Sequence, residues 1–100
     1  MTAIEFYRDD NGMPRARGTD SQLAVFLETD CQSASHHVTE ILQALERGEE
    51  GQFIGNAHEL SLDRTRATLT AMYDDQAPAR HMSTTYLRDV LGRWLEFVTT

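Results

Sequence analysis

The chain has 100 residues, enough for one domain with a single modest hydrophobic core. Its 16 acidic residues outnumber nine basic ones, all arginine, which gives a formal net charge of −7. This surplus disfavours nucleic acid and anionic membranes as partners and favours basic proteins. Cys31 is the only cysteine, so an intramolecular disulfide is excluded, and this fits a reducing cytoplasm.

No targeting or membrane segment is expected. The first residues lack a basic leader followed by an apolar stretch, which argues against a secretory signal. No apolar run approaches the length needed to span a bilayer. We therefore expect a cytoplasmic protein.

Two short strands are predicted at the start of the chain. Residues 3–8 are rich in β-branched and aromatic side chains and alternate weakly in polarity, which favours a strand. The Asp-Asp-Asn-Gly run at 9–12 is a strong turn signal. Residues 13–17 then return as an edge strand, because Pro14 cannot donate a hydrogen bond to a sheet.

The next segments indicate helices. Residues 20–30 fit both helical and strand periodicity, and we favour a helix capped by Asp20 or Ser21 while the strand alternative stays open. A second helix is predicted from Ser33 or Ser35, with Gly48 as its stop. Its apolar stripe consists of Val38, Ile41, Leu42 and Leu45.

The second half of the chain predicts a hairpin followed by a polar loop. Residues 53–63 and 67–73 read as two strands, and residues 74–82 as the loop. Gly55 is expected to mark a bend at the start of the first strand, and Asn56 to accept an unusual backbone conformation.

A capped helix closes the chain. Ser83 is a good N-cap, and Gly92 lies inside the helix, where it is expected to allow close packing against the sheet. The apolar stripe of this helix is Leu87, Val90, Leu91, Trp94, Leu95 and Val98. The predicted fold is α+β: a small, mainly antiparallel sheet packed against two or three helices in a single layer on one face, with 1–100 as one domain.

The candidate chemical motifs are incomplete. Cys31, His36 and His37 match no zinc spacing and lack a fourth ligand. Cys31 paired with a histidine would also need an orienting group and an oxyanion site, and no such motif accompanies it. We therefore expect no metal, no cofactor and no enzymatic activity.

Three carboxylate pairs lie in predicted polar turns, at 9–10, 49–50 and 74–75. Glycoside chemistry needs two carboxylates across a cleft with one pKa raised by burial, so these solvated pairs are better explained as turn formers. The alternative is that 49–50 and 74–75 form part of an acidic patch for a cationic partner.

Several segments carry a family resemblance: EFYRDDNGMP near the start, the Leu-rich helix ending in Gly48, GNAHELSL, the second strand ending in YDD, and LRDVLGRWLEFV. Together they resemble the small bacterial immunity proteins of contact-dependent growth inhibition systems. The chain is also similar to the small YacL-like bacterial proteins, which share the opening EF-x-R-D and the strand that begins with glycine.

The resemblance to the immunity family implies a non-catalytic protein that binds and neutralises the C-terminal toxin domain of a contact-dependent growth inhibition effector. Such toxins are often nucleases, whose active sites are basic because they hold phosphates. An acidic surface that mimics nucleic acid could therefore block such an active site. The alternative is a YacL-like cytosolic housekeeping or interaction domain without a toxin partner. Homodimer formation and the toxin's activity stay open. From charge and predicted exposure alone, the expected partner contacts are Glu28, Asp30, Glu49, Glu50, Asp74 and Asp75.

Overall fold

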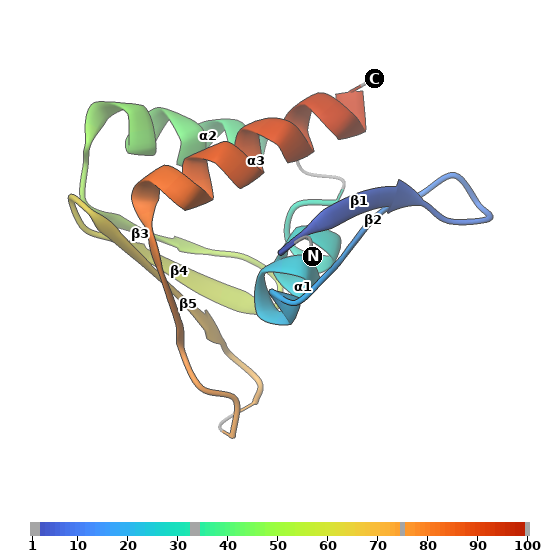
Figure 1. Cartoon of the computed structure of the whole chain (residues 1–100). Coiled ribbons are helices and arrows are strands. Elements are labelled where there is room, and N and C mark those ends of the chain that lie inside the picture. Colours follow the sequence, from blue (N-terminus) through green and yellow to red (C-terminus); the bar gives the residue numbers. More distant parts are fainter. Residues whose placement is uncertain (1–2, 33–34, 75, 100) are drawn as a thin grey trace.

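The structure is a computed structural model that describes residues 3–32, 35–74 and 76–99. Within these ranges the chain forms three helices and six antiparallel strands, and the strands are arranged in two small sheets (Figure 1). The predicted α+β fold is confirmed. In chain order the elements are β1 (Glu5–Arg8), β2 (Pro14–Arg17), α1 (Ser21–Thr29), α2 (Ser35–Arg47), β3 (Gly51–Ile54), β4 (His58–Leu62), β5 (Arg66–Ala71), β6 (Arg80–Ser83) and α3 (Thr84–Thr99).

The larger sheet is an antiparallel meander in the order β3-β4-β5-β6, and the smaller one is the β1–β2 hairpin. Alternation along the strands gives the larger sheet one buried and one open face. Side chains that point into the core are His58, Leu60, Leu62, Ala67, Leu69 and Met82. The half-buried or exposed side chains on the other face are Gln52, Ile54, Glu59, Ser61, Thr68, Thr70 and His81.

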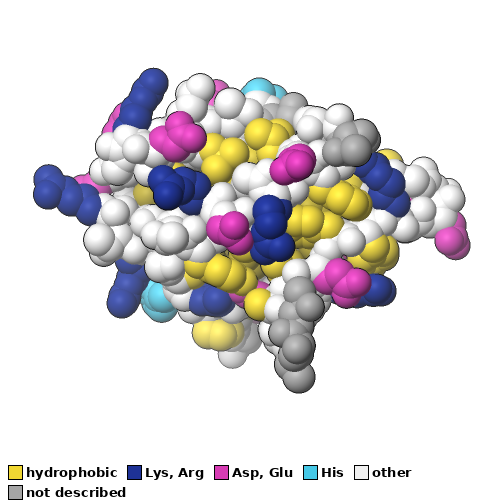
Figure 2. Space-filling view, turned by 45° about the horizontal axis from the view of Figure 1, so that its top comes forward, with side chains coloured by type: hydrophobic (Ala, Val, Ile, Leu, Met, Phe, Trp, Pro, Cys, Tyr) yellow, Lys and Arg dark blue, Asp and Glu magenta, His cyan; other side chains and the backbone are white. Residues whose placement is uncertain are grey.

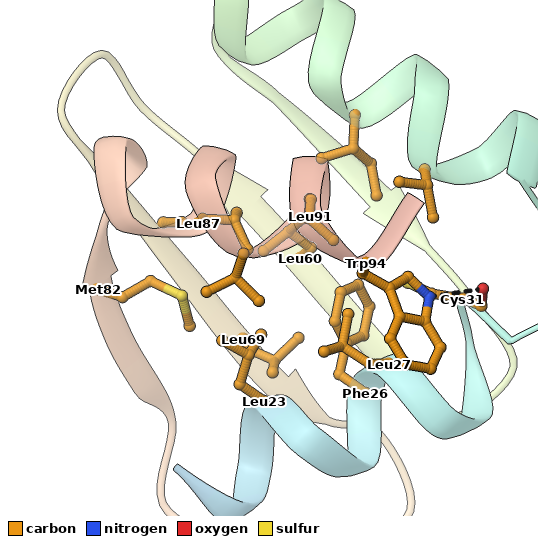
Figure 3. Close-up of a cluster of buried hydrophobic side chains, with 14 of the residues drawn as sticks. Leu23, Phe26, Leu27, Cys31, Leu60, Leu69, Met82, Leu87, Leu91 and Trp94 are labelled. Atoms are coloured by element: carbon orange, nitrogen blue, oxygen red, sulfur yellow. Dashed lines mark hydrogen bonds between the residues drawn. The ribbon is translucent and has the colours of Figure 1, made fainter. Parts of the chain in front are cut away.

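All three helices contribute to one hydrophobic core. The helices α2 and α3 lie side by side over the larger sheet, and α1 lies between that sheet and the β1–β2 hairpin (Figure 1). Phe26 and Leu27 of α1 reach the same cluster as Trp94 of α3 and Leu60 of β4 (Figure 3). The segment that fitted both a helix and a strand is therefore a helix, because this face of α1 fills the core. None of the described helices is long and apolar enough to cross a bilayer.

Two strands differ from the sequence-based prediction. The strand expected at 53–63 is two strands, β3 and β4, because the chain reverses at 55–57. The loop expected at 74–82 ends in β6, which pairs with β5. Both missed strands have four residues, too few to display a clear alternation of apolar and polar side chains.

The helix ends follow the predicted signals in most cases. The hydroxyl of Ser83 accepts a hydrogen bond from the Tyr86 N–H at 3.1 Å, as expected for an N-cap. Gly48 ends α2 with a φ of +66°, a conformation that glycine adopts without strain. Asp20 occupies the N-cap position of α1 but makes no capping hydrogen bond with its side chain, because that side chain is used elsewhere.

Gly92 provides a test of helix propensity. A Cβ added at Gly92 would meet no atom within 4 Å, so the expected close packing against the sheet is wrong. Glycine in a helix interior costs about 0.5–1 kcal/mol relative to alanine. We expect Gly92→Ala to raise the free energy of unfolding in urea by about that amount. A lower free energy of unfolding for the variant would contradict this prediction.

Candidate interaction surface at one end of the sheet

The six predicted contact residues do not form one patch. Glu49 and Glu50 are exposed and precede β3, at the end of the sheet that carries the β4–β5 turn. Asp74 is exposed and follows β5, at the opposite end. The five-residue strand β4 separates these ends by about 13 Å, so a shared acidic patch is not formed, and Asp75 lies outside the described residues.

The view onto the helices also shows no segregation of charge. Arginines and carboxylates are interspersed there with hydrophobic side chains (Figure 2). On α3, the Nε of Arg93 lies 3.2 Å from the Asp89 carboxylate one turn earlier, so these two opposite charges are paired. The acidic surplus is therefore not concentrated on this face.

Glu28 and Asp30 have structural contacts. Glu28 is half-buried, and its carboxylate accepts the Ala16 N–H at 2.9 Å, which joins α1 to β2. Asp30 is only 5% exposed. The exposure expected for Asp30 is therefore wrong, because the chain beyond α2 folds back over the end of α1.

The buried Asp30 carboxylate holds the turn between β3 and β4. It accepts the Ala57 N–H at 2.9 Å and lies 3.2 Å from His58 Nδ1, which must donate because a carboxylate only accepts. A Cβ at Gly55 would lie 2.7 Å from this carboxyl group. Position 55 therefore requires glycine, because the Asp30 carboxyl group approaches the backbone there too closely for a side chain. The unusual backbone expected for Asn56 is wrong, because no described residue other than glycine has a positive φ.

The start of α1 holds the loop between β5 and β6 at the same end of the sheet. The Gln22 side-chain amide donates to the Pro78 carbonyl at 2.5 Å. The Asp20 carboxylate accepts two hydrogen bonds from the Arg80 guanidinium, at 2.9 and 3.1 Å, and one from the Tyr86 hydroxyl at 2.9 Å. These contacts link α1 to β6 and α3. An open cleft of about 520 Å³ lies beside them, and the two charged groups lining it, Asp20 and Arg80, are paired with each other.

The Asp20 contacts predict a pH dependence of stability. Burial alone would raise the pKa of the Asp20 carboxyl, but the hydrogen bonds from Arg80 and Tyr86 bring that pKa below its usual value. A carboxyl with a lowered folded pKa stabilises above its unfolded pKa of about 4, and this contribution is lost as the pH falls through the folded pKa. We expect Asp20→Asn to be less stable than wild type at pH 7, with the difference narrowing below about pH 4. Urea titrations at pH 7 and at several pH values from about 4 down to about 2 test this, and a stability difference that stays constant over that range would contradict it.

Two exposed hydrophobic side chains lie at the end of the sheet that α1 supports. Ile54, the last residue of β3, is 67% exposed, and Tyr73, just after β5, is 84% exposed. The hydrogen bond from the Met72 N–H to the Ala57 carbonyl, at 2.9 Å, places the start of the β5–β6 loop beside the β3–β4 turn. Both side chains therefore belong to one end of the molecule.

Polar and acidic side chains accompany this pair. Glu59 is opposite Ile54 in the strand register, and Asp74 follows Tyr73. We name the set of Ile54, Asn56, Glu59, Tyr73 and Asp74 the turn surface. Exposed aromatic and aliphatic anchors with a polar rim are typical of protein interfaces. Of this set, the sequence alone indicated only Asp74 as a partner contact. Ile54 and Tyr73 lie within the predicted strands at 53–63 and 67–73, where hydrophobic side chains are expected and give no sign of exposure.

The environment of Cys31 does not favour a nucleophile. The side chain is fully buried, and its burial, together with the Asp30 charge, raises the pKa of the thiol far above its usual value. The thiolate is the form that attacks or binds metals, so this thiol is held in its unreactive form. Within 3–32, 35–74 and 76–99, no group of three or more histidine, cysteine or carboxylate side chains could hold a metal ion.

Comparison with known proteins adds no family. No protein-family model matches the chain, and neither the curated proteins nor the solved structures give a match.

Proposed function

We propose that this chain is a cytoplasmic immunity protein that binds and neutralises a basic toxin domain, of the kind carried at the C-terminus of contact-dependent growth inhibition effectors. The observation that carries the proposal is the turn surface, where exposed Ile54 and Tyr73 are accompanied by the carboxylates of Glu59 and Asp74. The family resemblance of the sequence gives the proposal its biological setting.

Rigidity of the turn surface supports a binding role. Association costs free energy when loops must become ordered. Here both segments that carry the surface are held from behind by α1, through Asp30 on the turn and Gln22 on the loop. The β3–β4 turn that carries Ile54 and Asn56 is therefore held in place before a partner arrives.

The charge of the chain supports a basic partner. A net charge of −7 on 100 residues accelerates association with a positively charged protein and slows it with nucleic acid. A nuclease that grips phosphates presents such a positive surface. Binding over that surface excludes its substrate, so inhibition needs no chemistry from this chain.

The test is co-expression with the toxin domain encoded beside this chain, in a host that the toxin kills. We expect wild-type protein to preserve viability. We expect Tyr73→Ala to raise the dissociation constant of the purified pair by about 10–100-fold, because exposed aromatic anchors carry much of the binding free energy of an interface.

Val25→Ala is the matched control for that variant. Val25 is also an exposed hydrophobic residue, at 48%, but it lies on α1 outside the turn surface, and its replacement should leave affinity unchanged. Association should slow as salt is raised. Cells that die equally fast with and without the wild-type protein would reject the proposal for that toxin and favour the housekeeping alternative.

A further inference from the structure

Strand β3 is an edge strand without the usual protection. Edge strands commonly carry charges, proline or a bulge that discourage pairing with another chain. The other edges follow this rule: β1 contains Glu5 and Arg8, β2 begins with Pro14, and β6 contains Arg80. The sequence of β3 is Gly-Gln-Phe-Ile, with neither charge nor proline.

The main chain of β3 is available for pairing. The hydrogen bond from the Gly55 N–H to the His58 carbonyl, at 2.9 Å, fixes which residues bond to β4. Because such bonds alternate along an antiparallel pair, Phe53 bonds to β4, and Gln52 and Ile54 turn their N–H and carbonyl groups away from the sheet. Both residues are exposed.

We propose that an extended segment of the toxin domain pairs with β3 and adds a fifth strand to the sheet. Its main chain bonds to Gln52 and Ile54, and an apolar side chain of the segment covers Ile54 on the open face of the sheet. The inference rests on the proposed function, because it takes the proposed toxin domain as the occupant of the edge.

Charge at the two ends of β3 selects a basic segment. Glu50 directly precedes the strand, and Glu59 lies opposite Ile54 on the open face. Lysine or arginine side chains near either end of the incoming segment therefore have a carboxylate within reach. A second copy of this chain, with its own charge of −7 and the same carboxylates, would be repelled at the same edge.

The first test is amide hydrogen exchange on wild-type protein, free and with the toxin domain. We expect the Gln52 and Ile54 amides to exchange at least about tenfold more slowly in the complex. The His81 amide is the internal control, because β6 is the opposite edge of the sheet and its exchange should not change. Unchanged exchange at Gln52 and Ile54 in a formed complex overturns this inference and leaves the proposed function standing.

The other outcomes are equally decisive. Absence of any complex with wild-type protein overturns the proposed function and this inference with it. Protection of both amides in the free protein, together with a dimer in analytical ultracentrifugation, would assign the edge to a second copy and overturn the inference.

A pair of variants at one position gives the second test. Gln52→Pro removes an N–H that points away from the sheet, so no bond to β4 is lost, whereas Gln52→Thr keeps that N–H. We expect Gln52→Pro to bind the toxin domain about tenfold more weakly than Gln52→Thr. Equal affinities would overturn the inference, and if Gln52→Pro does not fold, the exchange result on wild-type protein decides.

Discussion

Trp94→Ala is expected to lower the free energy of unfolding by about 4 kcal/mol, a large share of the 5–15 kcal/mol typical of a domain. Trp94 is fully buried. Its indole N–H donates to the Cys31 carbonyl at 3.1 Å (Figure 3). Its ring also meets the Phe6 ring edge-on, at 5.3 Å between centroids. One side chain thus joins α3 to the end of α1 and to β1, and its removal leaves a cavity at the meeting point.

Trp94→Phe separates the two contributions. Phenylalanine retains most of the apolar contact but leaves the buried Cys31 carbonyl without its donor, so we expect a loss of about 2 kcal/mol. Tyr73→Ala is the control, because an aromatic side chain that is 84% exposed should change stability by less than about 0.5 kcal/mol. Urea unfolding measures all three, and a loss below about 1 kcal/mol for Trp94→Ala would contradict the prediction.

The position of Trp94 was predictable from the sequence because long helices display their buried face repeatedly. Over α3 the spacing of three and four residues recurs for several turns, and Leu87, Val90, Leu91 and Trp94 are buried as that spacing predicts. The strands β3 and β6 offer only four residues each. Their pairing is fixed by neighbouring strands, which a local pattern does not reveal.

The candidate surface was less predictable than the core. Charge and expected polarity identify carboxylates, but they do not distinguish exposed Asp74 from buried Asp30. The burial of Asp30 depends on a contact with Ala57, 27 residues further along the chain. Ile54 and Tyr73 show the opposite case. They are exposed, but hydrophobic residues in or beside a strand are ordinarily assigned to a core, so their exposure was not predicted.

Asp30→Ala is expected to lower the free energy of unfolding by about 3 kcal/mol, because one buried and one partly buried donor lose their acceptor. These donors are the Ala57 N–H and His58 Nδ1, at 2.9 and 3.2 Å from the carboxylate. The control is Asp10→Ala, at an exposed position of the β1–β2 turn, which should cost less than about 0.5 kcal/mol.

Asp30→Asn distinguishes loss of contact from loss of charge. Its amide oxygen can still accept the Ala57 N–H, and its amide nitrogen can donate to the other tautomer of His58, so we expect a cost of about 1 kcal/mol. Under the proposed function, Asp30→Ala should also weaken toxin binding at a temperature where the variant is still folded, because the turn carrying Ile54 loses its support. Equal affinities of Asp30→Ala and wild type would show that the turn keeps its shape without the buried carboxylate, and Asp30 would then have a role in stability alone.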